Sequence, residues 1–385
     1  MSAIPLSLYI HIPWCERKCP YCDFNSHQQR DALNEAEYVS TLLADLDADL
    51  SHFGSTLQQR AIQTIFIGGG TPSLFSADSY ARLFDGIQQR LAFTSDIEIT
   101  LEANPGSSEA GKFRGFREAG VNRLSIGVQS FNPSHLSALG RIHSSNEAVL
   151  AAQAAQQAGF TNFNLDLMFG LPEQTESQAL ADLTQAIGLN PTHLSCYQLT
   201  IEPNTLFYHA PPVTPDDEAL WSMQDTLQTE LAAHGYHHYE VSAYSQTEQR
   251  CRHNLNYWQY GDYLGIGAGA HAKVTVDNTV QRAWKIKHPA TYISADNKLG
   301  DKSWSLIEPH ERPFEFMMNA LRLLDGFSKS LFEQRCQLPL THIDALLEKH
   351  ATLGLIEISA EHVRPTQFGH NMLNMMLEDY LDSQS

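Results

Sequence analysis

The chain has 385 residues and a formal net charge of −19, with 25 lysines and arginines against 44 aspartates and glutamates. This length suits a barrel-sized unit plus a smaller one, while the scarcity of basic residues argues against a nucleic-acid partner and against an anionic membrane surface. Because no apolar run approaches the roughly 18 residues that span a bilayer and the N-terminus does not resemble a signal peptide, we expect a soluble, cytoplasmic protein.

The first half of the chain alternates short strand-like runs with longer amphipathic helical patterns. Six such βα units imply an α/β fold with a parallel sheet, and right-handed crossovers of this size curl it into an open, partial (β/α)6 barrel. In such a barrel ligands gather at the C-terminal ends of the strands. The expected strands are Leu6–Ile12, Ile62–Ile67, Ile97–Leu101, Arg123–Gln129, Phe163–Met168 and His193–Thr200.

A cysteine run follows the first expected strand. Cys15, Cys19 and Cys22 lie within HIPWCERKCPYCDF. Three closely spaced thiolates can hold three irons of a cubane cluster, and without a fourth cysteine nearby one iron keeps an open position. The alternative is a structural zinc site that recruits His11 or His27 as a further ligand, which would make the chain a zinc-stabilised interaction protein.

Polar residues also follow the next strands. The second strand leads into a glycine run at 68–70, which allows close backbone approach to a ligand or forms a tight strand-exit turn. Glu102 and Gln129 end the third and fourth strands, and Asp166 lies on the fifth. Each of these side chains can be a loop cap whose hydrogen bonds are made within the protein, but polar residues at successive strand ends predict a shared cavity. Arg141, in LGRIH, is either a surface cation or a bidentate partner for a carboxylate.

Six motifs in one order resemble the radical S-adenosylmethionine proteins, and within them the oxygen-independent coproporphyrinogen oxidase branch, over nearly the full chain. They are HIPWCERKCPYCDF, IFIGGGTPS, EANPG, RLSIGVQSF, LGRIH and DLMFGLP. The resemblance implies that the three cysteines ligate a [4Fe-4S] cluster while S-adenosylmethionine chelates the fourth iron. It further implies a cofactor pocket formed by Tyr9, Tyr21, Gly70, Thr71, Glu102, Gln129, Arg141, Asp166 and Thr200.

Two departures separate the chain from the oxidase of this branch. The oxidase has a further cysteine two residues after the last cluster ligand, where this chain has Phe24, and it has a longer extension before the strand that contains Tyr9. These differences argue against the oxidase reaction, decarboxylation of two propionates. The pattern instead resembles a heme-chaperone branch, which implies binding of heme and its transfer to acceptor hemoproteins, including respiratory membrane subunits. Oxygen-independent coproporphyrinogen oxidation is the alternative.

The resemblance gives meaning to a second segment, His253-Asn254-Leu255-Asn256-Tyr257-Trp258, which matches the His-Asn-x-x-Tyr-Trp motif of the chaperone branch. Imidazole is a natural axial ligand of heme iron, so His253 is the expected ligand, and Tyr257 and Trp258 offer flat apolar surface to a porphyrin. Without the resemblance, such a histidine reads as a core or loop residue. His271 ends a glycine-rich run at 265–271 and is a second expected heme or cofactor neighbour; the run either approaches a ligand or packs tightly against the barrel.

The pattern changes near residue 300. We expect a barrel over residues 1–235, a barrel-closing extension over 236–300 and a winged-helix-like domain over 301–385 with a lid or partner-docking role. The acidic surface is compatible with a monomer or a homodimer. Within the last domain, helices are expected over Pro313–Leu324, Ile343–Leu353 and Phe368–Leu381, and strands over Leu355–Ile358 and Glu361–Arg364.

Overall fold

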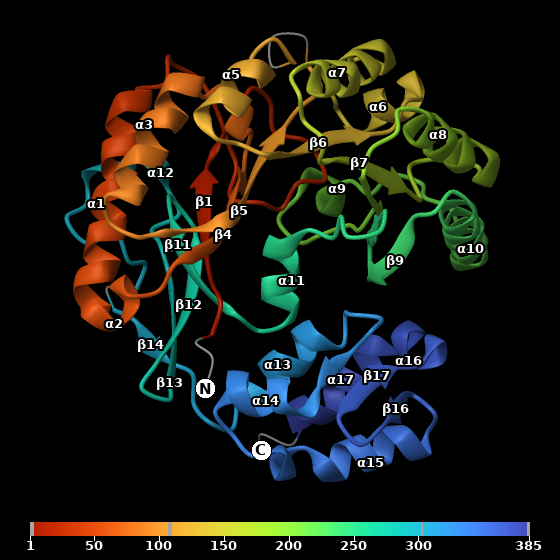
Figure 1. Ribbon diagram of the computed structural model, residues 1–385. Coiled ribbons are helices and arrows are strands. Elements are labelled where there is room, and N and C mark those ends of the chain that lie inside the picture. Colours follow the sequence, from red (N-terminus) through yellow and green to blue (C-terminus); the bar gives the residue numbers. More distant parts are fainter. Residues whose placement is uncertain (1–3, 107–109, 302, 383–385) are drawn as a thin grey trace.

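A computed structural model describes residues 4–106, 110–301 and 303–382 (Figure 1). Its main feature is a curved 12-stranded sheet in the order β14-β13-β12-β11-β1-β4-β5-β6-β7-β8-β10-β9. Six neighbouring strands in this order run parallel and form the barrel part of the sheet. They are β1 (Leu6–Ile12), β4 (Ile62–Gly69), β5 (Phe93–Ala103), β6 (Arg123–Gln129), β7 (Phe163–Phe169) and β8 (His193–Gln198).

Helices cover the outer face of the sheet (Figure 1). Side-chain caps set where several of them start: Ser144 and Thr175 each form a capping box with the residue at the third helical position. The covering helices are α1 (Glu35–Phe53), α2 (Ser55–Gln58), α3 (Ala77–Gln88), α5 (Phe113–Ala119), α6 (Pro133–Ala138), α7 (Ser145–Gln157), α8 (Glu176–Gly188) and α10 (Asp217–Ala233). The short helix α9 (Leu206–His209) lies instead beside the cysteine run, where the Phe207 amide donates to the Pro20 carbonyl.

The two faces of the barrel strands differ in chemistry. On β1, Leu8 and Ile10 belong to the large apolar core shared with the covering helices, whereas Ser7 and Tyr9 alternate with them and face the opposite side. The same alternation puts polar side chains at the aligned positions of the next strands, because Ser7 pairs with Thr64. The barrel interior is therefore largely polar, which suits a ligand site better than a packed core.

The segment after α10 adds strands to both edges of the sheet. β9 (His237–Glu240) and β10 (Ala243–Ser245) extend the β8 edge, and β11 (Asp262–Ile266) pairs in parallel with β1. Antiparallel strands β12 (His271–Val276), β13 (Thr279–Trp284) and β14 (Ser305–Leu306) follow. The outermost strands β14 and β9 are not paired with each other, so this segment lengthens the sheet instead of joining its edges. Between them, α11 (Arg252–Trp258) lies across the inside of the curve, and α12 (Pro289–Ser294) packs near α1 (Figure 1).

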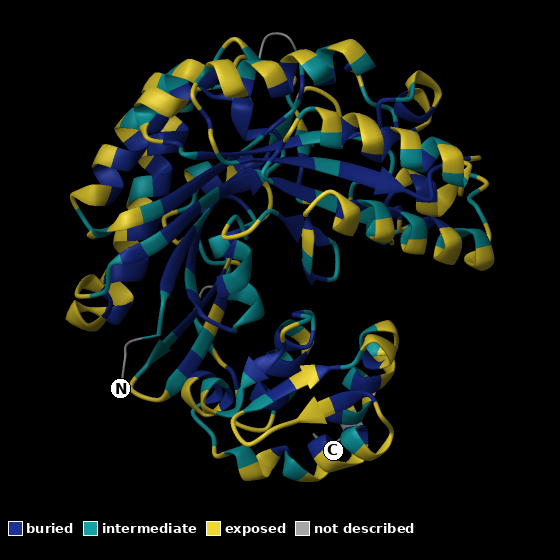
Figure 2. Ribbon diagram, turned by 45° about the vertical axis from the view of Figure 1, so that its right-hand side comes forward, coloured by how far each residue is buried: buried dark blue, intermediate teal, exposed yellow. Residues whose placement is uncertain are grey.

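The C-terminal part has its own apolar core, formed around Phe316, Phe332 and Val363, and is separated from the barrel core in Figure 2. A three-stranded sheet, β15-β17-β16, packs with its helices. The elements are α13 (Arg312–Ala320), β15 (Phe327–Ser328), α14 (Lys329–Cys336), α15 (Asp344–Thr352), β16 (Ile356–Ile358), β17 (His362–Pro365), α16 (Gln367–Asn371) and α17 (Leu373–Asp382), with a short 3-10 turn at Leu340–His342. A second 3-10 turn, Pro72–Leu74, lies in the barrel after β4.

The predicted fold, a partial (β/α)6 barrel with a smaller winged-helix-like domain, is confirmed. Bounds differ in detail: β8 ends at Gln198 and leaves Thr200 in the following loop, and the predicted last helix breaks into α16 and α17 at Met372. No helix in the described parts of the chain is both long and apolar enough to cross a bilayer. The domain bounds stay a prediction.

Candidate functional site

The three cysteines of the N-terminal run line one cavity of about 270 Å³, here called the cysteine cavity. Cys15 ends the short strand β2 (Trp14–Cys15), which pairs with β3 (His27–Gln28). The Cys19 and Cys22 side chains reach the same cavity from a turn in which the Cys22 amide donates to the Cys19 carbonyl (3.2 Å). Burial raises the pKa of the Cys15 thiol to about 11 and also raises that of Cys22. Thiolates here therefore need nearby positive charge, such as a metal centre.

The glycine run forms a tight turn and a cavity wall together. The Gly70 amide donates to the Ile12 carbonyl and the Thr71 amide to the Trp14 carbonyl, each at 2.7 Å, so the turn is fastened to the strand that leads to the cysteines. A Cβ atom on Gly70 would lie 2.5 Å from the Trp14 oxygen, which leaves room for glycine alone. Gly70 and Thr71 also line the cysteine cavity, so the two readings of this run are compatible.

Two acidic side chains lie on another wall of the cavity. Glu102 accepts a hydrogen bond from the Gly69 amide (3.1 Å), and Asp166 accepts from Asn164 (2.8 Å) and Ser125 (3.2 Å). Burial, and secondarily the negative charge of Asp166, raises the pKa of Glu102 to about 8. Burial raises the pKa of Asp166 as well. Glu102 is therefore protonated near neutral pH and can donate as well as accept a hydrogen bond.

Arg141 connects the cysteines to the strand ends. Its guanidinium donates to Asn104 Oδ1 (2.8 Å), to the Gly127 carbonyl (2.7 Å) and to the Cys19 sulfur (3.7 Å), while its buried Nε has no hydrogen-bond partner among the described residues. Gln129, which lines the cavity, has a left-handed φ of 68° at the point where the pairing of β6 with β7 shifts register. The Tyr197 hydroxyl donates to Gln129 Oε1 (2.6 Å).

Most residues expected around the cofactor meet in this cavity. Tyr9 instead lines a neighbouring cavity of about 560 Å³, whose wall also includes Gly69 and Glu102. Thr200 is exposed in the loop after β8 and lines neither cavity. Two residues that line the cysteine cavity were not predicted: Tyr197 of β8, and Asn104, which lies in the EANPG motif. The expected residues that share the cysteine cavity are Cys15, Cys19, Cys22, Tyr21, Gly70, Thr71, Glu102, Gln129, Arg141 and Asp166.

The cysteine cavity fits a cluster and a small cofactor better than a single zinc ion. Three sulfurs face a space with an open glycine wall and an unpaired guanidinium nitrogen. Both nitrogens of His11 are already engaged, by the Tyr9 hydroxyl (3.0 Å) and the Asn25 carbonyl (2.9 Å). Among the residues that the structure describes, no three His, Cys, Asp or Glu side chains, the three cysteines included, are grouped so that they could hold one metal ion.

His253 lies inside the barrel at the start of α11. Its ring is 1% exposed, and its Nδ1 is 2.8 Å from Thr64 Oγ1. Because Thr64 donates its own proton to Ser7 (2.7 Å), it accepts one from Nδ1–H, which leaves Nε2 as a buried lone pair without a partner. Burial lowers the pKa of His253 to about 3, so the ring is neutral. Glu98 accepts the amide protons of Arg252 (3.2 Å) and His253 (3.1 Å) and so fixes the helix start.

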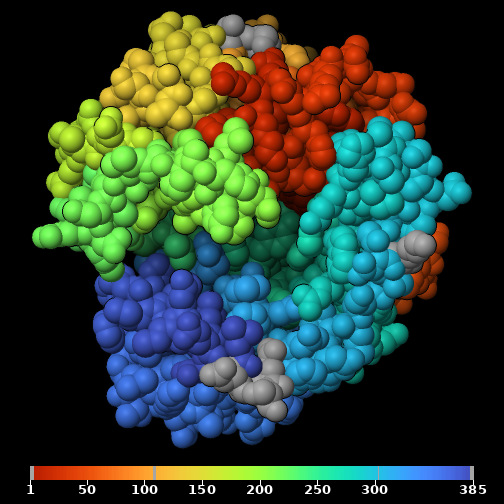
Figure 3. Space-filling view, turned by 180° about the vertical axis from the view of Figure 1, so that it is seen from behind, coloured from red at the N-terminus to blue at the C-terminus, as the bar shows by residue number. Residues whose placement is uncertain are grey.

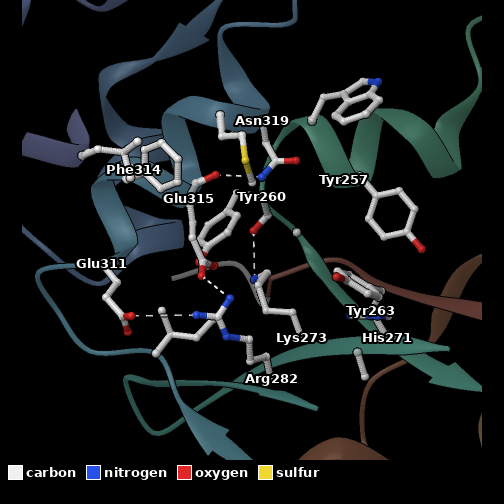
Figure 4. A pocket seen from close by; sticks show the side chains of 16 residues that line it. Tyr257, Tyr260, Tyr263, His271, Lys273, Arg282, Glu311, Phe314, Glu315 and Asn319 are labelled. Carbon is white, nitrogen blue, oxygen red and sulfur yellow. Dashed lines mark hydrogen bonds and ion pairs between the residues drawn. The ribbon is translucent and has the colours of Figure 1, made fainter. Parts of the chain in front are cut away.

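The aromatic residues of the same helix face outward into a different space. Tyr257 and Trp258 border a cavity of about 570 Å³ between α11, the β12–β13 hairpin and α13, here called the aromatic cavity (Figure 4). Arg282 on its wall is paired with Glu315 (2.6 Å). Further wall residues are Tyr260, Gly261, Tyr263, His271, Ala272, Lys273, Ile307, Glu311, Phe314, Met318, Asn319 and Leu381. His253 packs against the Tyr257 ring (4.8 Å) but does not border this cavity.

The glycine-rich run before His271 packs against protein. A Cβ atom on Gly267, whose φ is 105°, would collide with the His11 carbonyl oxygen, and one on Gly269 would collide with the Asn25 amide group. Asn25 Nδ2 also donates to the Ala268 carbonyl (2.8 Å). This close packing is the second of the two readings of the run, and it fixes the position of His271 at the start of β12.

Comparison with known proteins finds similarity along the whole chain. Residues 9–185 match the family model of the Radical SAM superfamily, and residues 307–370 match that of the HemN C-terminal domain. Proteins named heme chaperone HemW are similar: 48% identical in Haemophilus influenzae over 99% of both chains, 48% in Escherichia coli over 98% of both, and 34% in Bacillus subtilis over 97% of this chain and 99% of the relative.

A solved structure supports the fold alone. It is coproporphyrinogen III oxidase (HemN) from Escherichia coli, described as a radical SAM enzyme. It aligns with a TM-score of 0.80 and 22% sequence identity, covering 98% of this chain and 90% of the oxidase.

Proposed function

Because this chain belongs to the family of the heme chaperone HemW, within the radical SAM superfamily, we propose that it binds heme and passes it to acceptor hemoproteins. The observation that carries this proposal is the similarity to HemW proteins over almost the entire length. The resemblance read from the motifs is confirmed at the level of the family. The aromatic cavity of about 570 Å³ supports the binding of a flat ligand.

We further propose that Cys15, Cys19 and Cys22 ligate a [4Fe-4S] cluster and that S-adenosylmethionine occupies the cysteine cavity. When bound, such a cluster can supply an electron of low potential to the sulfonium group of the cofactor. The residues around it act by position: Arg141 stabilises the Cys19 thiolate by charge, and protonated Glu102 can donate a hydrogen bond to a cofactor hydroxyl. Supporting contacts come from Tyr9, Tyr21, Gly70, Thr71, Gln129 and Asp166, with Thr200 a more distant candidate.

The finer parts of the function are predictions. We propose that Tyr257 and Trp258 contact heme, and His253 stays a predicted iron ligand whose buried position requires α11 to move. We propose respiratory hemoproteins, membrane subunits among them, as acceptors, and the cytoplasm as the place of transfer. A homodimer also stays a prediction.

An anaerobic hemin titration tests the proposal. The full chain, with its cluster reconstituted, should bind hemin saturably and give a shifted Soret band. The same sample should not decarboxylate coproporphyrinogen III when reductant and S-adenosylmethionine are present. Turnover with only unsaturable hemin binding would instead place this chain with the oxidases, and would mean that Phe24 does not prevent that reaction.

A transfer assay tests the role of the cofactor. Hemin-loaded protein is mixed with an apo-hemoprotein in the presence of S-adenosylmethionine, of a non-cleavable analogue, or of neither. Faster transfer with both compounds indicates that cofactor binding controls release, and faster transfer with the cleavable cofactor alone indicates that its cleavage is needed. Equal transfer in all three samples contradicts a role of the cofactor in transfer.

A further inference from the structure

Three cavities adjoin along one hollowed side of the molecule. The space of about 560 Å³ that contains Tyr9, here called the bridging cavity, shares Gly69 and Glu102 with the cysteine cavity. It shares Tyr257, Tyr263 and His271 with the aromatic cavity. Figure 3 shows the corresponding hollow between the barrel, the β12–β13 region and the C-terminal part. A large flat molecule could therefore extend from the helix α11 to the edge of the cofactor site.

The bridging cavity is basic although the chain as a whole is strongly acidic. Lys18 and Lys287 are exposed on its wall, and neither takes part in an ion pair with any described residue. The acidic side chains on this wall are Asp23 and Glu102, and burial raises the pKa of Glu102 to about 8, which removes its charge near neutral pH. Unpaired ammonium groups at the mouth of a cavity suit a ligand that bears carboxylates along one edge.

His271 has the properties of an accessible metal ligand. Its side chain is exposed at the junction of the bridging and aromatic cavities, and its ring makes no hydrogen bond or ion pair with the part of the chain described. Partial desolvation by the cavity walls, together with the charges of Lys287 and Arg282, lowers its pKa although the side chain is open to solvent, so the imidazole is neutral and keeps a free lone pair. The rings of Tyr257 and Tyr263, which pack edge to face at 4.5 Å, form aromatic walls beside it (Figure 4).

His253 lacks this accessibility. It borders none of the three cavities, and the rings of Phe66 (5.2 Å) and Tyr257 (4.8 Å) pack against it. A porphyrin could reach its Nε2 only after the groups that bury this ring, the Phe66 and Tyr257 rings among them, had moved aside.

We infer that heme binds across the bridging and aromatic cavities with its iron on His271 and its propionates toward Lys287 and Lys18. This inference rests on the proposed function and assigns a ligand other than His253. It places the edge of the porphyrin beside Gly69 and Glu102, which also border the cysteine cavity. A molecule bound in the cysteine cavity would then be a direct neighbour of the heme.

Hemin titrations of the full chain test the ligand assignment. His271→Ala should weaken hemin binding at least about tenfold, since losing only a residue that hydrogen-bonds to a metal ligand already costs about that much. It should also abolish the iron–histidine band in the resonance Raman spectrum of the reduced complex. Added imidazole should restore histidine-like ligation. His234→Ala is the matched control, because that ring is exposed and contacts Glu230 of its own helix; it should change neither readout.

Two results would overturn the assignment. His271→Ala with unchanged affinity and an unchanged iron–histidine band, together with loss of both in His253→Ala, would mean that the buried ring binds the iron. If the wild-type chain does not bind hemin in a saturable way, the proposed function itself is contradicted. The wild-type titration shows this before any variant is compared.

A second titration tests the orientation of the heme. Lys287→Ala should weaken hemin binding by about two- to fivefold, as expected for an exposed ion pair. It should leave the affinity for hemin dimethyl ester unchanged, because the ester has no carboxylates. Equal effects on both compounds, or no effect on either, would contradict propionates at Lys287.

Discussion

Glu102 shows how one buried side chain can respond to pH. Its carboxyl group lies between two cavities, accepts the Gly69 amide and has a pKa raised from about 4.5 to about 8, first by burial and second by Asp166. A carboxyl group with a raised folded-state pKa contributes stability that is complete below its unfolded pKa and is lost as the pH rises through the folded value. Without a cofactor, this residue therefore destabilises the fold at alkaline pH.

Glu102→Gln should remove that pH dependence because the amide cannot ionise. The free energy of unfolding of the variant, measured by urea titration without cofactor, should exceed that of the wild type by an amount that grows between about pH 4.5 and pH 8. Glu361→Gln, at an exposed turn, serves as the control and should give no such trend. A constant difference across this range would show that Glu102 does not change its charge there.

Prediction from residues works best at strand ends: Glu102 and Asp166 line one cavity because the C-terminal ends of parallel strands share one edge of a sheet. Arg141 reaches the same cavity from the loop after α6. Prediction from residues could not place His253, since the local sequence indicates an aromatic helix but not the surface on which the helix packs. Nor could it show that Thr200 lies beyond the end of its strand, because strand bounds depend on pairing with neighbours.

At the scale of elements, a buried ion cluster ties α1 to the strand extension. Lys285, just after β13, is 1% exposed and places its Nζ 2.7 Å from Asp45 and 2.8 Å from Asp49, both on α1. Tyr292 of α12 donates a further hydrogen bond to Asp45. The cluster holds three elements from distant parts of the sequence in one arrangement.

Lys285→Ala should destabilise the fold strongly, since it leaves two buried carboxylates without a counter-charge. We expect a loss of about 3–5 kcal/mol in the free energy of unfolding, measured from urea midpoints. Lys349→Ala is the matched control: its lysine pairs with Asp379 at the surface and is half exposed, so the loss should stay below about 1 kcal/mol. Equal losses in the two variants would contradict the structural role of the buried cluster.

For the whole molecule, polar contacts join the C-terminal part to the extended sheet around the aromatic cavity. Glu315 of α13 pairs with Arg282 (2.6 Å) and accepts from the Tyr260 hydroxyl (2.8 Å). Arg322 pairs with Glu240 (3.3 Å). Tyr260 also packs into the apolar core of the C-terminal part, so these polar contacts and that ring together hold the cavity between the two parts.

Glu315→Ala should loosen this contact without unfolding either core. We expect faster amide hydrogen exchange in α13 and β13 and a loss of about 1 kcal/mol in stability, as for one net hydrogen bond. Glu311→Ala tests the same arginine at longer range, 4.0 Å, and should have a smaller effect. Unchanged exchange in Glu315→Ala would mean that apolar packing alone fixes the two parts.

The sequence predicted the barrel because the outward positions of its strands are apolar at a regular spacing, as in Leu6–Ile12. The pairing of β11 with β1 could not be predicted in this way, since the local pattern of a strand does not identify a partner far along the chain. For the same reason the strands that extend both edges were expected only as a closing segment.

The pairing of β11 with β1 also has a consequence for synthesis on the ribosome. Leu6 lies beside Asp262, so one edge of the first strand stays without a partner until most of the chain has been translated. At elongation rates of about 5–20 residues per second this interval is roughly 10–50 s. An apolar strand with an open edge is a template for aggregation during that time. A protein proposed to bind and transfer heme therefore needs its own first strand shielded while the rest of the chain is made.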